Sequence, residues 1–307
     1  MKIEHILKKY LEPEAKLLLS FVIKKPKEYI LAHPEYKISL WQKIKFDYLW
    51  KKMQSGIPFA YITGHKEFFN LDFLVNKHTL IPRPDTETLV DNCIDEISNF
   101  QFPISNSLLI DIGTGTGCVP ISILKRLNKL SSRDPQGRGD PTVGLLHPIR
   151  NDTTKITAVA TDISKKALKI AKKNAKKHSV KIKFLQGDLL SPVLHAYKLI
   201  DLQALIITAN LPYLKEEWWK NEPSIQKEPK SSLVSDNKNG LELYEKLLQQ
   251  ITEIKKILDI GYWIFLEIDP RQSSEIFKLI QKYLPKASIE IIKDLSNFDR
   301  VVKIKIS

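Results

Sequence analysis

The segment that most restricts the fold is a glycine-rich turn, Asp111-Ile-Gly-Thr-Gly-Thr-Gly117, which lies between two regular patterns. Ser107 to Ile110 is predicted as a short apolar strand, and Cys118 to Lys129 carries apolar residues at helical spacing. Because glycine has no Cβ and readily adopts positive φ, such a turn lets the backbone approach a ligand beside the free amides of a helix N-terminus. The pattern therefore predicts one strand–turn–helix unit of an α/β fold.

The spacing of this turn distinguishes between ligands. A dinucleotide fingerprint, G-x-G-x-x-G, requires its third glycine where this chain has Cys118. The turn opens instead on Asp111, whose carboxylate repels a pyrophosphate and suits a cationic amino-acid group. We therefore predict S-adenosylmethionine as the ligand, and an ordinary strand-to-helix turn is the alternative. The predicted cofactor residues of the turn are Asp111, Gly113, Thr114, Gly115, Thr116 and Gly117.

A second motif, Asn210-Leu-Pro-Tyr213, follows the apolar strand predicted over Leu205 to Ala209. Ligands of open α/β sheets bind at the carboxyl edge of the strands, where this quartet emerges. The Asn210 side-chain oxygen and the Leu211 carbonyl can accept both hydrogens of a planar NH2 group, while the Tyr213 ring lies against its face. Pro212 restricts the backbone and aims the Leu211 carbonyl. The alternative is a strand-ending turn with a buried tyrosine.

Taken together, these motifs resemble the HemK/PrmC family, the protein-(glutamine-N5) methyltransferases of peptide chain release factors. The resemblance extends from about Gly56 to Val302. It rests on the two motifs above and on the following segments: Gly56-Ile-Pro-Phe-Ala-Tyr-Ile-Thr-Gly64, Ile81-Pro-Arg-Pro-Asp-Thr-Glu87, Glu228-Pro229, Asn239-Gly240-Leu241 and Asp299-Arg-Val-Val302. One departure is Leu211, which stands where the family has the first proline of its motif.

Further cofactor contacts are predicted at the ends of two other strands. Thr157 to Thr161 leads to Asp162, at the place where such folds put an acidic residue that binds the ribose hydroxyls. Lys181 to Leu185 leads to Asp188, which can accept from the adenine amino group, and to Leu189, which covers the ring. Each of the three is otherwise a plain turn residue. Asn210 is expected to contact both the cofactor and the target.

The alternation of strands and helices predicts an α/β fold, a class I methyltransferase (Rossmann-like) doubly wound sheet of about seven strands. Residues 1–62 are predicted as an all-helical substrate-docking domain, with helices over Ile3–Leu11, Pro13–Val22 and Leu40–Ser55. Residues 63–82 are predicted as a hairpin linker, and residues 83–307 as the S-adenosylmethionine-dependent domain. Residues 131–154 change abruptly in composition and are predicted as a disordered insertion, with an RNA-binding arm as the alternative.

The composition excludes several classes of protein. The two cysteines and seven histidines have no metal-ligand spacing, so no metal is expected. No apolar run is long enough to span a membrane, and we expect a cytoplasmic protein that is a monomer. The net charge of +13 is compatible with acidic or nucleic-acid partners, but the lysines are spread along the predicted helices as on a solvated face. Direct binding of nucleic acid is therefore not expected.

The resemblance to this family implies methyl transfer from S-adenosylmethionine to the side-chain amide nitrogen of the glutamine in the GGQ motif of class 1 peptide chain release factors. The residues predicted to bind the target and to carry catalysis are Asn210, Leu211, Pro212 and Tyr213. Arg83, Asp85 and Glu87 either line the site or cap and pair with the helix that follows them. The alternatives are methylation of a ribosomal-protein glutamine and adenine-N6 methylation of nucleic acid.

Overall fold

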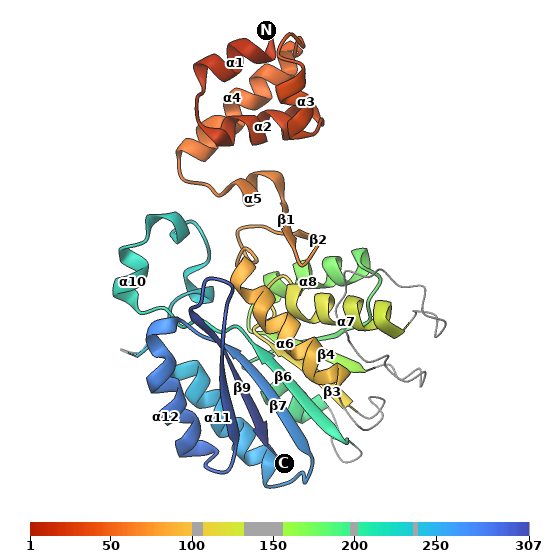
Figure 1. Ribbon diagram of the computed structural model, residues 1–307, viewed down its shortest axis with the longest axis vertical. Helices are drawn as coiled ribbons and strands as arrows, with labels where there is room; N and C mark the ends of the chain where they lie inside the picture. The colour runs from red at the N-terminus through yellow and green to blue at the C-terminus, as the bar shows by residue number, and fades with distance from the viewer. Residues whose placement is uncertain (100–106, 132–155, 197–201, 236–238, 307) are drawn as a thin grey trace. The chain divides into compact units, whose positions relative to one another are not determined.

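The computed structural model describes residues 1–99, 107–131, 156–196, 202–235 and 239–306 (Figure 1). The chain divides into two compact units, Met1–His65 and Lys66–Ser307. The insertion predicted over 131–154 lies outside the described residues, apart from Ser131 at the end of a helix. Among the described residues, no helix is long and apolar enough to cross a membrane.

The first unit consists of helices, as predicted. They are α1 (Ile3–Lys9), α2 (Pro13–Ile23), α3 (Lys27–Ala32), α4 (Leu40–Gln54) and α5 (Phe59–Thr63). Helix α4 begins at a capping box, in which the Ser39 hydroxyl accepts from the Gln42 amide and the Gln42 side chain accepts from the Ser39 amide. The two helices that the sequence pattern did not predict, α3 and α5, are six and five residues long, too short to show helical periodicity.

The rest of the chain forms a hairpin and a large sheet with its helices. The strands are β1 (His65–Phe68), β2 (Leu71–Leu74), β3 (Ser107–Ile112), β4 (Thr157–Asp162), β5 (Lys183–Gln186), β6 (Ala204–Ala209), β7 (Gly261–Glu267), β8 (Ser288–Lys293) and β9 (Asp299–Ile306). The α-helices are α6 (Glu87–Ser98), α7 (Cys118–Ser131), α8 (Lys165–Lys177), α9 (Ser191–Ala196), α10 (Glu216–Lys220), α11 (Glu242–Lys255) and α12 (Ser273–Tyr283). The short 3-10 helices are η1 (Pro84–Thr86), η3 (Pro223–Ile225), η4 (Lys230–Ser232) and η5 (Pro270–Gln272).

The large sheet has seven strands in the order β5-β4-β3-β6-β7-β9-β8. Strands β5, β4, β3, β6 and β7 are parallel, and β9 pairs antiparallel with both β7 and β8. The chain builds outward from β3 to β5 and then returns to place β6 on the other side of β3. This arrangement confirms the predicted doubly wound sheet and puts its topological switch point between β3 and β6.

Two hydrophobic cores cover the two faces of this sheet. Alternate residues of β3 and β6 point to opposite faces, because side chains alternate along a strand. Leu108, Ile110 and Leu205 belong to the core that includes α11 and α12, whereas Leu109 and Ile206 belong to the core that includes α6 and α7. Both central strands are buried along their whole length, which explains their continuous apolar sequence. In Figure 1 the helices α6, α7 and α8 lie together, as do α11 and α12.

The predicted hairpin forms from β1 and β2, with Phe69 and Asn70 in the turn at φ of 51° and 56°. Positive φ at both central residues is typical of the turn that matches the twist of a two-residue hairpin. The Phe69 amide donates to the Glu87 carboxylate at 2.8 Å, so this carboxylate holds the hairpin to the start of α6. Of the two readings of Glu87, its contact supports the structural one.

Candidate active site

The two predicted motifs meet at the switch point because their strands are neighbours. Strands β3 and β6 pair in parallel, with Asp111 opposite Thr208 and Ile112 opposite Ala209. The Thr208 hydroxyl donates to Asp111 Oδ1 at 2.7 Å. The turn after Ile112 and the quartet after Ala209 therefore leave the sheet side by side at the same carboxyl edge.

A pocket of about 330 Å³ opens at this edge. Most of the predicted cofactor and target residues line it, namely Asp111, Gly113, Thr114, Gly115, Thr116, Asp162, Asp188, Leu189, Asn210, Leu211 and Pro212. Gly117 and Tyr213 do not belong to this lining. Gly117, at φ 79°, instead lies where an added Cβ would be 3.3 Å from the Ala171 side chain, so it lets α8 approach the turn.

Hydrogen bonds within the protein occupy the Thr114 and Gly115 amides of the glycine turn. The Thr114 amide donates to the Thr161 carbonyl at 2.9 Å, and the Gly115 amide donates to Asp162 Oδ2 at 2.9 Å. The other carboxylate oxygen of Asp162 accepts from the Ser164 amide at 2.7 Å. Asp162 thus fixes the turn as well as lining the pocket, a second task that its position in the sequence did not indicate.

The pocket carries carboxylates in a poorly solvated setting. Burial raises the pKa of Asp111 to about 7, and it also raises the pKa of Asp162. The predicted adenine contact, Asp188, has 40% of its side chain exposed and pairs with Lys246 at 2.5 Å. Beside it, Leu189 is buried and adopts a φ of 47°.

This donor set fits S-adenosylmethionine better than a phosphate ligand. The amides of Thr114 and Gly115 point inward to protein acceptors and form no anion-binding cradle. Asp111 offers a buried carboxylate for an ammonium group, and Asp162 offers a second at the end of the next strand. The exposed Ile163 side chain also lines the pocket and provides an apolar surface for a flat ring. Sequence inspection missed Ile163, although it directly follows the acidic residue.

The quartet is tied into the fold at each of its functional positions. Asn210 Nδ2 donates to the Thr86 hydroxyl oxygen at 3.2 Å. The Leu211 amide donates to the Tyr244 hydroxyl at 3.3 Å, and the Leu211 side chain is 3% exposed. Tyr213 is not part of the pocket lining, and its hydroxyl donates to Glu267 Oε1 at 3.4 Å.

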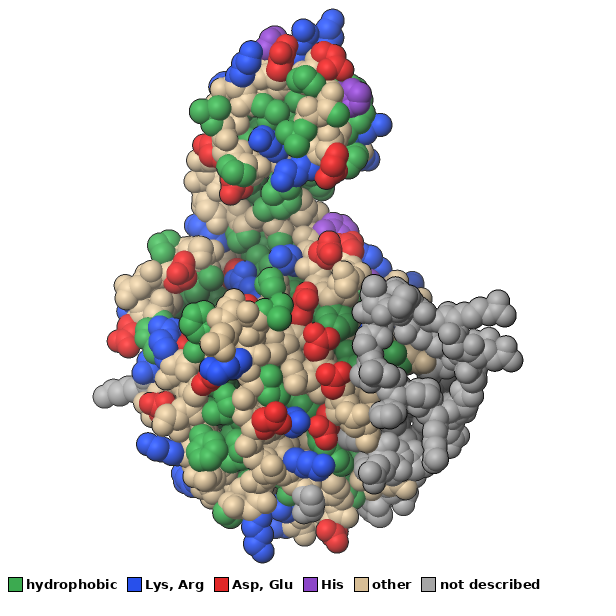
Figure 2. All heavy atoms as spheres, viewed as in Figure 1, with side chains coloured by type: hydrophobic (Ala, Val, Ile, Leu, Met, Phe, Trp, Pro, Cys, Tyr) green, Lys and Arg blue, Asp and Glu red, His purple; other side chains and the backbone are tan. Residues whose placement is uncertain are grey.

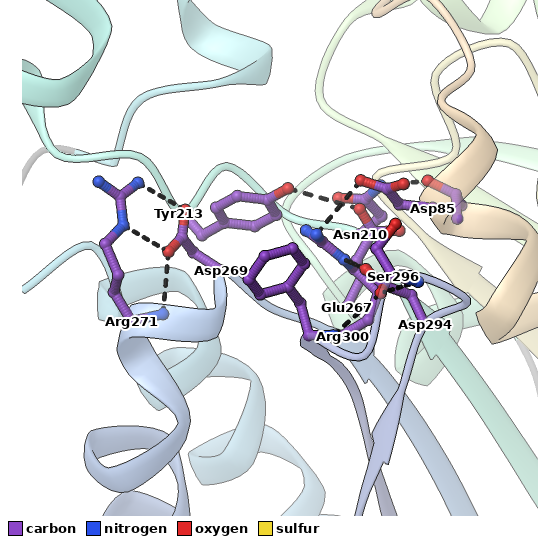
Figure 3. A network of polar contacts seen from close by, with 11 residues as sticks. Asp85, Asn210, Tyr213, Glu267, Asp269, Arg271, Asp294, Ser296 and Arg300 are labelled. Atoms are coloured by element: carbon purple, nitrogen blue, oxygen red, sulfur yellow. Dashed lines mark hydrogen bonds and ion pairs between the residues drawn. The ribbon is translucent and has the colours of Figure 1, made fainter.

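A polar network includes Asn210 and Tyr213 of the quartet (Figure 3). It centres on Glu267, the last residue of β7, which is 1% exposed. Burial raises the pKa of this carboxyl to about 7, while a hydrogen bond with Thr86 and the charge of Arg300 oppose that shift. Arg300 also pairs with Asp85 at 3.2 Å and with Asp294 at 3.0 Å. One clue to Glu267 is visible in the sequence, since a carboxylate ends an apolar strand there just as Asp111 lies at the end of another.

The segment before α6 also reaches the pocket. Arg83 lines the pocket and pairs with Glu228, whose side chain is 1% exposed. The other Glu228 oxygen accepts from the Ile81 amide at 2.9 Å. Arg83 therefore lines the site and pairs with Glu228 rather than with the helix that follows it, while Asp85 pairs with Arg300 outside the lining.

The loop after the quartet carries the two tryptophans of α10. The Arg271 guanidinium lies 3.5 Å from the centre of the Trp218 ring, and Lys230 lies 5.0 Å from that of Trp219. Cations thus lie over both rings, which supports packing within the loop. Among the described residues, no cluster of His, Cys, Asp and Glu suited to a metal ion is present.

Comparison with known proteins places this geometry in a family. Residues 9–64 match the PrmC N-terminal domain. The release factor glutamine methyltransferase of Enterococcus faecalis is 35% identical over 252 residues, which are 81% of this chain and 76% of that protein. The enzyme of the same name from Yersinia pestis is 31% identical over 289 residues, 94% of this chain and 90% of that protein.

Among solved structures, the catalytic domain of hMettl16, in complex with MAT2A 3'UTR hairpin 1, matches with a TM-score of 0.52. The two sequences are 15% identical, and the match covers 78% of this chain and 76% of the hMettl16 chain. At this low identity, the likeness shows the fold alone. The two bacterial relatives exceed 30% identity over most of their own length. By this similarity, the chain belongs to the family of release factor glutamine methyltransferases.

Proposed function

We propose that this S-adenosylmethionine-dependent methyltransferase methylates the side-chain amide nitrogen of the glutamine in the GGQ motif of class 1 peptide chain release factors. One observation carries the proposal: Asn210 and the glycine turn line a single pocket at the switch point of the sheet. A carboxamide target and a cationic donor can therefore meet in one site. The family to which the chain belongs supports release factors as the substrate.

On the donor side, S-adenosylmethionine supplies an electrophilic methyl group on a sulfonium. We assign Asp111 to its ammonium group and Asp162 to its ribose hydroxyls, since both carboxylates line the pocket. Asp188 and Leu189 are assigned to the adenine, which Ile163 can contact from the other side. The Thr114 and Gly115 amides donate to acceptors within the protein, and these bonds hold the glycine turn and Asp162 in place. Such preorganisation lowers the entropy lost on binding.

On the acceptor side, the protein orients a weak nucleophile. An amide nitrogen shares its lone pair with its carbonyl, so its two hydrogens must be held while the lone pair turns to the methyl carbon. Asn210 Oδ1 and the Leu211 carbonyl are the acceptors that we assign to these hydrogens, and Pro212 restricts the loop that carries them. Positioning at near-attack distance then supplies most of the rate. As the bond between nitrogen and the methyl carbon forms, the bond between that carbon and the sulfonium sulfur breaks. The charged methylated amide then releases one proton to water, so no strong base is required.

Tyr213 has a different position from the one that its motif suggests. We predicted that its ring lies against the target amide, and this role stays a prediction because the residue is outside the pocket lining. Its hydroxyl is hydrogen-bonded to Glu267, and its carbonyl accepts from the Gln272 side chain at 3.0 Å. Both contacts support a role in holding the quartet in place.

The helical unit is the proposed docking element for the release factor. Its match to the PrmC N-terminal domain supports this assignment. The division into a helical domain over 1–62, a linker over 63–82 and a catalytic domain over 83–307 is part of the proposal, as are a monomer and a cytoplasmic location.

Nucleic acid is the less favoured substrate. An adenine-N6 methyltransferase flips its target base into the pocket and requires a basic surface around it. On the face seen in Figure 2, the Lys and Arg side chains of the described residues are interspersed with Asp and Glu. This mixed pattern supports a solvated surface and disfavours a nucleic-acid track on that face.

The test is mass spectrometry of a purified release factor incubated with the enzyme and S-adenosylmethionine. We expect one added methyl group on the glutamine of the GGQ loop. Asn210→Ala should lower kcat by roughly 10²- to 10³-fold, as for loss of one preorganised hydrogen-bonding group, while the Kd for S-adenosylhomocysteine changes less than about threefold. Methylation of only a ribosomal protein or of nucleic acid would refute the proposed substrate, and an equal loss of cofactor affinity would refute the assignment of Asn210.

A further inference from the structure

The two ends of the Asn210 side-chain amide are not equivalent for the proposed reaction. Its oxygen can accept a hydrogen from a substrate amide, whereas its nitrogen can only donate. A rotation of the side-chain amide by 180° would therefore present two donors to a substrate NH2 group, which is itself a donor. The activity proposed above depends on a device that keeps the nitrogen inward and the oxygen toward the pocket.

Thr86, which also lines the pocket, contacts the nitrogen end of this amide. Its hydroxyl oxygen accepts from Asn210 Nδ2 at 3.2 Å, and the residue is 3% exposed. Thr86 occupies the N-cap position of α6, where a threonine hydroxyl normally caps the helix, yet it makes no side-chain cap hydrogen bond. The hydroxyl of Thr86 thus serves the site and not the helix that follows it.

Glu267 determines the direction of the hydrogen bond between Thr86 and Asn210. The Thr86 hydroxyl also interacts with the Glu267 carboxyl, and this interaction lowers the pKa of the carboxyl, as expected where the hydroxyl hydrogen is directed toward it. An ionised carboxylate accepts only, so the single Thr86 hydrogen goes to Glu267 and the Thr86 oxygen is left to accept. Only the nitrogen end of the Asn210 amide can donate to that oxygen.

The surroundings of Glu267 make the reverse arrangement costly. Glu267 Oε1 accepts from the Tyr213 hydroxyl at 3.4 Å, while Oε2 is buried with no hydrogen-bond partner among the described residues. One oxygen of this carboxylate already has no donor in the described part of the chain. Loss of the Thr86 hydrogen would take a further donor from the same carboxylate. A flipped Asn210 amide would require that loss, because Thr86 would then have to donate to the amide oxygen.

We propose that Thr86 and Glu267 are positioning residues that fix the orientation of the Asn210 amide and so present its oxygen to the target amide. The inference rests on the proposed function, because it gives Asn210 Oδ1 the role of acceptor. The two residues come from η1 and from the end of β7, and neither belongs to the quartet itself. Figure 3 shows Glu267 near the Asn210 and Tyr213 side chains of the quartet.

The test is a double-mutant cycle at pH 8, above the pKa of about 7 of the Glu267 carboxyl. Thr86→Val removes the hydroxyl at nearly constant volume, and Thr86→Ser is the matched control that keeps it. We expect Thr86→Val to lower kcat for release-factor methylation about 10- to 100-fold with the KM for S-adenosylmethionine within about twofold, and Thr86→Ser to stay within about threefold of wild type. In the Asn210→Ala background, Thr86→Val should change the residual single-turnover rate less than about twofold, because its target is gone.

A full multiplicative loss in the double variant would overturn the proposal, since Thr86 would then act independently of Asn210. Wild-type kcat in Thr86→Val would also overturn it. Glu267→Gln is a second variant for the case that Thr86→Val does not fold. It is expected to lower kcat at least about fivefold and to add less than about twofold to Asn210→Ala, and an additive effect counts against the proposal in the same way.

A readout without substrate separates this inference from the proposed function. The side-chain NH2 signals of Asn210 in a ¹H–¹⁵N NMR spectrum can be identified by their loss in Asn210→Ala. We expect hydrogen exchange at this NH2 group to accelerate at least about fivefold in Thr86→Val and to stay near wild type in Thr86→Ser. If the exchange behaves so while no release factor is methylated, the orientation stands and the substrate is wrong. Unchanged exchange in Thr86→Val would refute the orientation.

Discussion

Proton release on cofactor binding follows from the burial of Asp111. The residue is 3% exposed, and burial raises its pKa to about 7. A cationic ligand is bound by the carboxylate form, so below this pKa the proton must leave before the ligand binds. For one linked proton, the apparent Kd exceeds its high-pH limit by a factor of about 11 at pH 6 and about 1.3 at pH 7.5. We therefore expect the affinity to be about eightfold lower at pH 6 than at pH 7.5.

Isothermal titration calorimetry with S-adenosylhomocysteine measures this dependence, because the ligand keeps the amino-acid group and undergoes no reaction. Asp111→Asn is expected to bind more weakly and to lose most of the pH dependence, since the amide does not titrate but still accepts from the Thr208 hydroxyl. Glu267→Gln is the matched control, because the Glu267 carboxyl also has a pKa of about 7 but does not line the pocket. Equal affinity at the two pH values, or an undiminished dependence in Asp111→Asn, would refute the reasoning.

Two further predictions concern the scaffold of the quartet. Tyr244→Phe leaves the buried Leu211 amide without its acceptor, so it should lower the free energy of unfolding by about 1–3 kcal/mol in urea titrations. A change below about 0.5 kcal/mol would contradict this prediction. Gly240→Ala places a Cβ 2.2 Å from the Tyr213 carbonyl oxygen at φ 72°, so it should destabilise the protein and lower kcat. Gly64→Ala is the matched control, because Gly64 has a φ of 77° but no atom within 4 Å of an added Cβ. If both variants lower the thermal midpoint equally, the contact between the added Cβ and the Tyr213 carbonyl has no effect.

The sequence predicts those parts of the site that depend on strand order and local pattern. Asp111 lies near the end of β3 and Asn210 follows β6, and the carboxyl ends of parallel strands share one edge. The alternating pattern of strands and helices therefore suffices to bring the two motifs together. The structure confirms the doubly wound sheet for the same reason, since its central strands are buried on both faces.

Contacts across long sequence separations could not be predicted in this way. Thr86 reaches Asn210 across 124 residues, and Tyr213 reaches Glu267 across 54 residues. No spacing rule links such partners, because their meeting depends on how the strands and loops pack in the finished fold. Thr86 looks like a helix cap in the sequence, and only the structure shows that its hydroxyl turns elsewhere.

Leu211 illustrates how the fold accommodates a departure from the family motif. A proline at this position has no amide hydrogen, whereas Leu211 has one that must be satisfied because the residue is buried. The Tyr244 hydroxyl accepts it at 3.3 Å and donates in turn to the Glu267 carbonyl. The Leu211 side chain also packs against the glycine turn, since its Cδ2 would lie 3.1 Å from a Cβ at Gly113. A hydrogen bond and a side-chain contact thus restrain the loop where the family uses a ring, and the Leu211 carbonyl needed for the target amide is retained.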